Sequence, residues 1–204
     1  MSSLSYHHRF EAATDPSAPP LLLLHGTGGD ENDLIPLGRK LSPGSALLNP
    51  RGDVSEHGAR RFFARLGEGI FDPAEVTRRT HALADFILAA GKHYRFDPAK
   101  LTAVGFSNGA NIAATLLLLR PETLGAAVLL RPMVVLEPAT PPDLRGRRVL
   151  ISSGDFDPIV PGDHPARLAD LLRRAGADTT LRTHAASHGL APGDFAAARE
   201  FLAG

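Results

Sequence analysis

One serine stands in a pattern that could make it a nucleophile. Residues 105–109 read Gly-Phe-Ser-Asn-Gly, a G-x-S-x-G spacing, between an apolar strand-like run and a run that predicts a buried helix. A serine on so sharp a turn has a strained backbone, and a Cβ two residues to either side would collide with it. Gly105 and Gly109 remove those Cβ atoms. The turn would lift the Ser107 hydroxyl above the sheet and place the Asn108 N–H at a helix start, where negative charge is favoured.

The same pattern arises by chance in many sequences, and a turn built from small residues is the alternative interpretation. A serine hydroxyl is also a poor nucleophile unless a base accepts its proton and an acid orients that base. The catalytic interpretation of Ser107 therefore requires an acid and a histidine further along the chain, in that order.

Two aspartates compete for the role of the acid. Both follow the apolar run 149–152, in the segment 153–161. Asp155 is nearer the predicted strand end, where its side chain could cap the turn. Asp157 lies further into the loop, and Pro158 restricts the backbone at this point. We favour Asp157, although turn chemistry could explain either residue.

Three histidines follow or flank that acid and could act as the base. His164 precedes a proline and could begin a helix, whereas His184 falls in or at the end of the predicted strand 179–183. His188 lies in a loop between the last strand and the last helix. A histidine must sit there to reach over the top of the sheet, so we favour His188; the alternative is an ordinary surface histidine.

A tetrahedral intermediate needs two backbone donors aimed at its oxyanion. We expect one from Asn108 and the other from Thr27, in the glycine-rich segment 26–29 that follows a buried strand. A phosphate-binding loop is a weaker interpretation, because the G-x-x-x-x-G-K-[ST] pattern is lacking. His25 is expected to hold this loop by hydrogen bonds.

Acidic residues follow the glycine-rich segment closely. Asp30, Glu31 and Asp33, together with His25, could suggest a metal site. Their spacing over a turn and a helix start fits capping and dipole complementarity better. We therefore expect no metal.

The elements that position these residues alternate between strands and helices. Continuous apolar runs predict strands buried on both faces, and the alternation predicts a parallel α/β sheet with its ligand at the carboxyl ends of the strands. The predicted strands cover 21–25, 46–48, 101–104, 126–130, 149–152 and 179–183, with an edge strand in 4–12; the predicted helices cover 33–41, 73–94, 111–119, 165–175 and 192–202. Residues 49–71 are expected to be irregular, and 132–142 to form a connecting loop.

Composition narrows the class of protein. The 204 residues are 43% hydrophobic, which suits a single domain over 1–204 with a full core. Lys plus Arg equals Asp plus Glu at 22 each, so no charge excess points to nucleic acid. There is no cysteine, which excludes disulfides and a thiol nucleophile. Residues 1–6 do not predict a signal peptide, and apolar runs are too short to span a bilayer, so a cytoplasmic protein is expected.

Four motifs in this order resemble the phospholipase/carboxylesterase family, the α/β-hydrolase branch that contains acyl-protein thioesterases and small bacterial carboxylesterases. They are the segments 24–31, 105–110, 154–161 and 187–189, and the resemblance covers nearly the whole chain. Segments 49–54 and 58–63 look closer to the bacterial members, including those linked to hydroquinone resistance. The resemblance implies an α/β-hydrolase fold with a mostly parallel central sheet, helices on both faces and no large lid.

By this resemblance Ser107, Asp157 and His188 form the catalytic triad, and Thr27 and Asn108 are the oxyanion-hole donors. Asn108 stands where many thioesterases have glutamine, a small change because the backbone N–H does the work. Segment 49–71 differs from the acyl-channel region of the thioesterases, which argues against long-chain substrates. No cofactor is needed, and related enzymes are often homodimers.

Three aromatic and two basic residues in that segment have two interpretations each. Phe62, Phe63 and Phe71 could line an acyl or aromatic pocket, or pack the loop onto the body. Arg60 and Arg61 could attract an anionic substrate, although a solvated face is favoured.

The sequence predicts a serine esterase that cleaves small to medium (thio)esters through an acyl-enzyme. A perhydrolase or a dienelactone-hydrolase-like lactonase is an alternative, although the latter usually employs the cysteine that this chain lacks. A catalytically silent hydrolase fold used as a binding module is the third interpretation.

Overall fold

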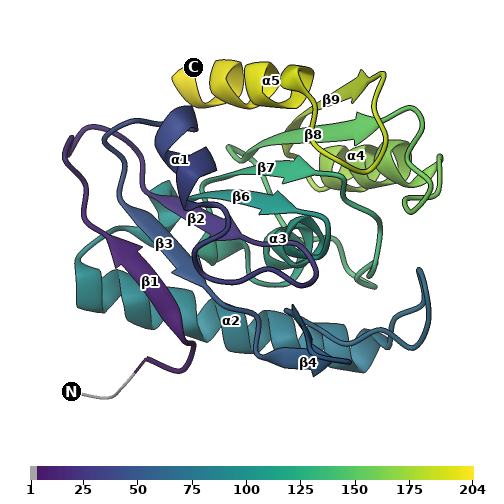
Figure 1. The fold of residues 1–204 in the computed structure, drawn as a ribbon, viewed down its shortest axis with the longest axis horizontal. Helices are drawn as coiled ribbons and strands as arrows, with labels where there is room; N and C mark the ends of the chain where they lie inside the picture. Colours follow the sequence, from purple (N-terminus) through teal and green to yellow (C-terminus); the bar gives the residue numbers. More distant parts are fainter. Residues whose placement is uncertain (1–3) are drawn as a thin grey trace.

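A seven-stranded sheet forms the centre of the protein in a computed structural model that describes residues 4–204 (Figure 1). Residues 1–3 of the N-terminal segment considered above lie outside the described part. The strand order is β1-β3-β2-β6-β7-β8-β9. The strands are β1 (His8–Glu11), β2 (Leu21–Leu24), β3 (Leu47–Pro50), β6 (Thr102–Phe106), β7 (Ala126–Leu130), β8 (Arg148–Gly154) and β9 (Asp178–His184).

Neighbouring strands are parallel except for β1, which pairs antiparallel with β3 at the edge. The predicted edge strand within 4–12 and the parallel sheet are therefore both confirmed. Several elements run beyond the predicted bounds at the carboxyl side. β6 continues to Phe106 and β8 to Gly154, because hydrogen bonding to neighbouring strands carries each strand past its apolar run.

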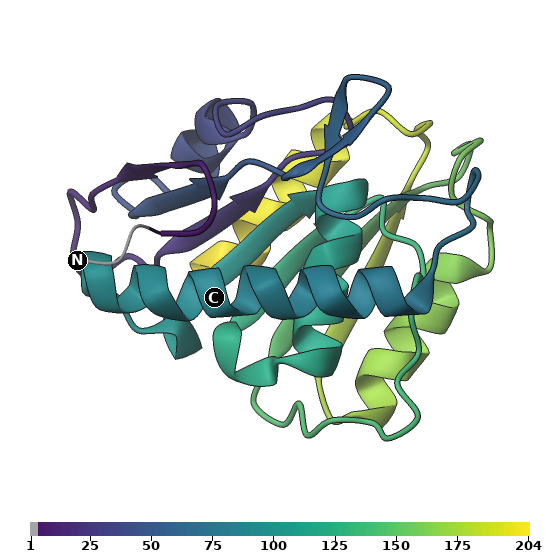
Figure 2. The same cartoon turned by 90° about the horizontal axis from the view of Figure 1, so that it is seen from below.

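Helices cover both faces of this sheet, as predicted (Figure 2). Helices α2, α3 and α4 pack on one face, and α1 and α5 on the other. Their bounds are α1 (Ile35–Leu41), α2 (Pro73–Tyr94), α3 (Asn108–Leu119), α4 (His164–Arg174) and α5 (Pro192–Ala203), with 3₁₀ turns at Pro98–Lys100 and Pro121–Thr123. In β2, Leu22 and Leu24 face the α2 side while Leu21 and Leu23 face the α1 side, as the two-residue period of a strand requires.

The expectation that 49–71 is irregular is wrong for part of the segment. Strands β4 (Val54–Glu56) and β5 (Ala59–Arg61) form an antiparallel hairpin. The two residues of its turn, His57 and Gly58, have φ values of 50° and 87°. Positive φ at both positions matches the twist of a hairpin, and histidine is an uncommon first residue there, which hid the turn in the sequence. Residues 132–142 are a connecting loop, as expected.

Within residues 4–204, every helix is too short or too polar to cross a membrane.

Candidate active site

Ser107 sits on the turn between β6 and α3 with a strained backbone. Its φ of 52° and ψ of −116° lie where residues with a side chain are rarely found. A Cβ on Gly105 would lie 2.5 Å from the carbonyl oxygen of Gly109, and a Cβ on Gly109 would collide with the Leu24 carbonyl of β2. Only glycine fits at either position; the clash at Gly105 lies within the turn, as predicted, whereas the clash at Gly109 is with β2.

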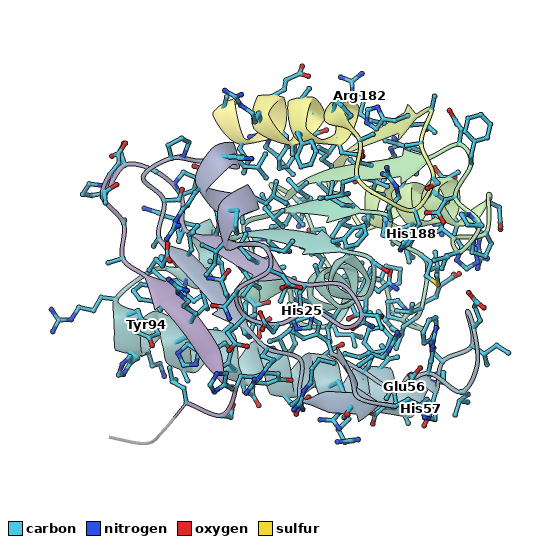
Figure 3. The ribbon with its side chains drawn as sticks, in the orientation of Figure 1. His25, Glu56, His57, Tyr94, Arg182 and His188 are labelled. Carbon is cyan, nitrogen blue, oxygen red and sulfur yellow. The ribbon has the colours of Figure 1, made fainter. Side chains whose placement is uncertain are left out.

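Three of the predicted residues meet at the carboxyl ends of the strands. His188 Nε2 lies 2.9 Å from Ser107 Oγ, and His188 Nδ1 lies 2.8 Å from Asp157 Oδ2. With Nδ1–H donating to the carboxylate, Nε2 is the acceptor for the serine hydroxyl. Figure 3 shows His188 on the side of the sheet toward which the strand arrows point. The chain thus brings together a hydroxyl, an imidazole and a carboxylate, each from a different strand end.

Asp157 is held as a carboxylate. Its side chain is only 4% exposed, and Oδ1 accepts hydrogen bonds from the N–H groups of Ile159 at 2.8 Å and Val160 at 3.1 Å. Burial acts to raise the pKa of Asp157, but these N–H groups and His188 outweigh it, so the pKa lies below its usual range. The carboxylate therefore stays ionised where the histidine works.

The competing candidates lie elsewhere. Asp155 is exposed in the turn after β8, and His164 begins α4, where its Nδ1 accepts the Val134 N–H at 3.2 Å. His184 ends β9 and faces Asp194 at 3.8 Å. The structure thus gives helix-start and strand-end positions to His164 and His184, as the sequence indicated.

The glycine-rich loop after β2 is tied down from two sides. His25 is buried, its Nδ1 lying 2.7 Å from the Gly26 carbonyl while its Nε2 accepts the Gly52 N–H at 2.9 Å. The β5 strand supplies the second tie, because the Gly28 N–H donates to the Arg60 carbonyl at 2.9 Å. Thr27 lies in this loop and lines the same hollow as Ser107.

Arg61 corrects the expectation of a solvated basic face. Its side chain is 5% exposed and donates to Thr27 Oγ1 at 2.5 Å and to the Phe63 carbonyl at 3.1 Å, with Glu56 at 3.5 Å. The alternation of a strand turns Arg61 inward and leaves Arg60 exposed, so only Arg60 fits the expected solvated position.

A hollow of about 310 Å³ opens beside Ser107, and we call it the serine hollow. Both proposed oxyanion donors line it, and the Asn108 N–H has no partner inside its helix because it belongs to the first turn. Apolar surface comes from Phe71, Phe106, Met133 and Ile159.

Two of the three aromatic residues pack the loop onto the body, which is one of the two interpretations that the sequence left open, and do not line the pocket. Phe62 and Phe63 are fully buried in the core, whereas Phe71 lines the hollow. The Phe62 N–H donates to Asn108 Oδ1 at 2.7 Å, which fastens the loop to α3. Met133 was not found from the sequence because it comes from the proline-rich loop; its N–H donates to Asn111 Oδ1 at 2.8 Å.

The acidic residues after the glycine loop have structural partners. Asp30 Oδ1 accepts the Asn32 N–H at 2.7 Å, and Glu31 lies 2.9 Å from His7 and 3.4 Å from Arg51. Among the described residues, no group of three or more His, Asp or Glu side chains could hold a metal ion.

Sequence reasoning also missed a buried ion pair behind the histidine. Arg131 and Asp194 have fully buried side chains that meet at 2.7 Å. The signal was available, since an arginine directly follows the apolar run 126–130 and an aspartate lies inside the apolar helix 192–202.

Known proteins share both the sequence and this architecture. Residues 57–198 match the dienelactone hydrolase family. The chain is 41% identical over 194 residues to "Putative hydrolase MhqD" of Bacillus subtilis, covering 95% of this chain and 96% of that protein.

The chain belongs to the dienelactone hydrolase family. Solved structures agree with this assignment. A Bacillus cereus carboxylesterase has a TM-score of 0.95 at 41% identity, with 98% of this chain and 94% of that chain covered. A Mesorhizobium loti carboxylesterase has a TM-score of 0.93 at 35% identity, with 100% and 97% covered.

These relatives confirm the α/β-hydrolase fold and the resemblance to carboxylesterases, and they make the protein a hydrolase of the dienelactone hydrolase and carboxylesterase kind. The family name is also consistent with the lactonase alternative predicted from the sequence. The roles of Ser107, Asp157, His188, Thr27 and Asn108 stay predictions.

We expect the stability of the fold to depend on a neutral His25. Burial lowers the pKa of His25, and the neighbouring Gly26 carbonyl and acidic residues only partly oppose this. A protonated ring would also lose its Nε2 acceptor for the Gly52 N–H. Because the folded pKa is below the unfolded one, this contribution is complete above about pH 6.5 and is lost as pH falls below it.

Thermal denaturation between pH 5 and pH 8 checks this expectation. The Tm of the wild type should fall more steeply toward acid than the Tm of His25→Gln, whose amide oxygen can accept a hydrogen bond and does not titrate. His57→Gln, at the exposed hairpin turn, is the matched control and should keep the wild-type slope. If Tm falls equally with pH in the wild type and in His25→Gln, protonation of His25 does not control the stability of the fold.

Proposed function

We propose that the protein is a serine esterase that hydrolyses small to medium carboxylic esters and thioesters. The observation that carries the proposal is the continuous hydrogen-bond chain from Asp157 through His188 to Ser107. Its two distances of 2.8 and 2.9 Å are those of a nucleophile joined to an oriented base. Family membership supports hydrolysis as the reaction class.

The reaction would proceed in two acyl transfers. Ser107 Oγ attacks the carbonyl carbon as His188 Nε2 takes its proton, and the resulting oxyanion accepts the N–H groups of Thr27 and Asn108. The intermediate collapses and the leaving alcohol or thiol takes the proton from His188. Water then attacks the acyl-serine by the same steps, which releases the acid and restores Ser107.

The serine hollow indicates the size of the acyl group. At about 310 Å³ it lies at the lower end of the range for small-molecule sites, roughly 300–1,000 Å³. Charged side chains such as Arg65 and Glu68 also line the hollow, but its four apolar side chains favour short acyl or aryl groups. A long chain would have to leave the hollow and contact solvent.

Hydrolysis of p-nitrophenyl acetate, butyrate, octanoate and palmitate tests the proposal. We expect kcat/KM to be highest for acetate or butyrate and roughly tenfold or more lower for palmitate, because a chain too long for the hollow must be ordered on binding without gaining contacts that offset this cost. Met133→Ala enlarges the hollow and should move the optimum toward octanoate. An exposed apolar control, Phe195→Ala on α5, should leave the profile unchanged.

Cyclic esters belong in the same panel because the chain is a member of the dienelactone hydrolase family. A lactone is opened by the same attack, with the alcohol staying attached to the acyl group. Turnover of a lactone in strong preference to every open-chain ester would make the protein a lactonase. Background rates with both kinds of substrate would contradict the proposed function and favour the binding module.

A further inference from the structure

Arg131 directly follows β7 and is the largest of the fully buried side chains. Its guanidinium is 0% exposed, and its backbone has a φ of 56°. Both features are costly for an arginine, because a buried charge must be paired and a left-handed backbone is strained. A side chain held in this way needs strong local partners, and Arg131 has them on three sides.

The first partner is Asp194 on α5. Arg131 Nη1 and Nη2 donate to the two carboxylate oxygens at 2.7 and 2.8 Å. The same carboxylate accepts from Ser152 Oγ at 2.6 Å and from the Ala191 N–H at 2.7 Å. Burial acts to raise the pKa of Asp194, but the bonds from Arg131, Ala191 and Ser152 outweigh it, and the pKa is lowered. The pair therefore stays charged and joins the end of β7 to α5, with Ser152 of β8 bonded to the same carboxylate.

Arg131 Nη1 also donates to the Ser152 carbonyl of β8 at 3.2 Å, and two further bonds reach the loop 185–191 that carries His188. Nε donates to the Ser187 carbonyl at 3.0 Å, and Nη2 donates to the Gly189 carbonyl at 3.0 Å. These carbonyls belong to the residues immediately before and after His188. Both residues are exposed, so side-chain packing restrains this stretch only weakly. One rigid guanidinium plane thus fixes the backbone on both sides of His188.

We propose that Arg131 is a positioning residue that holds His188 at hydrogen-bond distance from Ser107, with Asp194 fixing the plane of its guanidinium. Other ties hold the start of the loop, where the Phe156 N–H donates to the Ala186 carbonyl at 3.0 Å. These ties end at Ala186, two residues before His188. A displacement of about 1 Å at a catalytic group can cost roughly 10²-fold in rate. This inference rests on the proposed function, because it assigns Arg131 a role through His188.

The test separates positioning from folding stability. In the double variant Arg131→Met/Asp194→Asn no buried charge is left unpaired, and the amide oxygen can still accept from Ser152 or Ala191, so Tm should stay near the wild-type value. Its kcat for p-nitrophenyl acetate should fall about 10²-fold with KM changed by less than roughly threefold. Arg131→Lys, which keeps the charge but cannot bridge both carbonyls, should show the same split.

The single variant Asp194→Asn should differ from the double variant in the opposite way, with a lower Tm but a higher activity. It leaves a buried arginine charge without its counter-ion, so its Tm should be the lowest, but it retains the donors to Ser187 and Gly189 and should keep more activity than the double variant. Arg148→Lys is the matched control. Arg148 Nη2 donates to the Phe201 carbonyl at 2.9 Å, which ties β8 to the far end of the same helix. Its kcat should equal that of the wild type.

A kcat for the folded double variant within roughly twofold of the wild type would overturn the inference, as would rates that simply follow Tm across the set. Ser107→Ala in the same assay keeps the two claims apart. Full activity in Ser107→Ala would contradict the proposed function. Loss in Ser107→Ala together with unimpaired folded Arg131 variants would contradict the positioning role alone.

Discussion

Replacing Ser107 with alanine is expected to lower kcat for p-nitrophenyl butyrate by about 10⁵-fold or more, the scale found when the serine nucleophile of a hydrolase is removed. Alanine has no oxygen to form the acyl-enzyme, and the remaining rate would come from the oxyanion donors and substrate binding alone. The backbone at this position keeps its φ of 52° with either side chain, so Tm should change little. Steady-state hydrolysis and thermal denaturation of the purified variant measure both quantities.

Covalent labelling tests whether Ser107 is the nucleophile without relying on substrate turnover. A fluorophosphonate should add one phosphonyl group to the wild type, seen as an intact-mass shift, and none to Ser107→Ala. Ser153→Ala is the control, because Ser153 is a buried serine near the end of β8 whose hydroxyl donates to the Arg182 carbonyl at 3.5 Å. A label that persists in Ser107→Ala would place the nucleophile elsewhere.

The candidate site was accessible to sequence reasoning because its members obey local rules. Gly105 is required by a collision within the turn itself, and Gly109 by a collision with the neighbouring β2, and both glycines appear in five consecutive letters. Asp157 and His188 follow predicted strands, and the carboxyl ends of parallel strands share one edge. Chain order and strand ends were therefore enough to bring three distant residues together.

What the sequence could not predict depends on side-chain direction across long separations. Phe62 and Phe63 are indistinguishable from Phe71 as letters, but only the packing of the loop decides that the first two enter the core. Arg131 and Asp194 each stand out beside or within an apolar run, but they are 63 positions apart and nothing in the letters pairs them. Their pairing follows from the way α5 crosses the sheet, which one-dimensional periodicity does not contain.

The choice between the two aspartates leads to the other large expected effect. Asp157→Asn should lower kcat about 10⁴-fold while KM changes little. Asparagine keeps an oxygen for the Ile159 and Val160 N–H groups, so the loop should retain its shape. Its NH₂ group would then face His188 Nδ1 and stabilise the tautomer with the proton on Nε2. That tautomer cannot accept the Ser107 proton, so the base is lost without any displaced atom.

Asp155→Asn is the matched control, since Asp155 lies two residues away on the same turn and is exposed. It should keep wild-type kcat. The wild-type pH profile adds a second check, because the pKa of Asp157 is lowered and its carboxylate stays charged well below the pKa of an ordinary histidine, about 6.5. No step from the Asp157 carboxylate should therefore appear in the profile above the pH at which an ordinary aspartate titrates, about pH 4. Loss of activity in Asp155→Asn with a normal Asp157→Asn would exchange the two assignments.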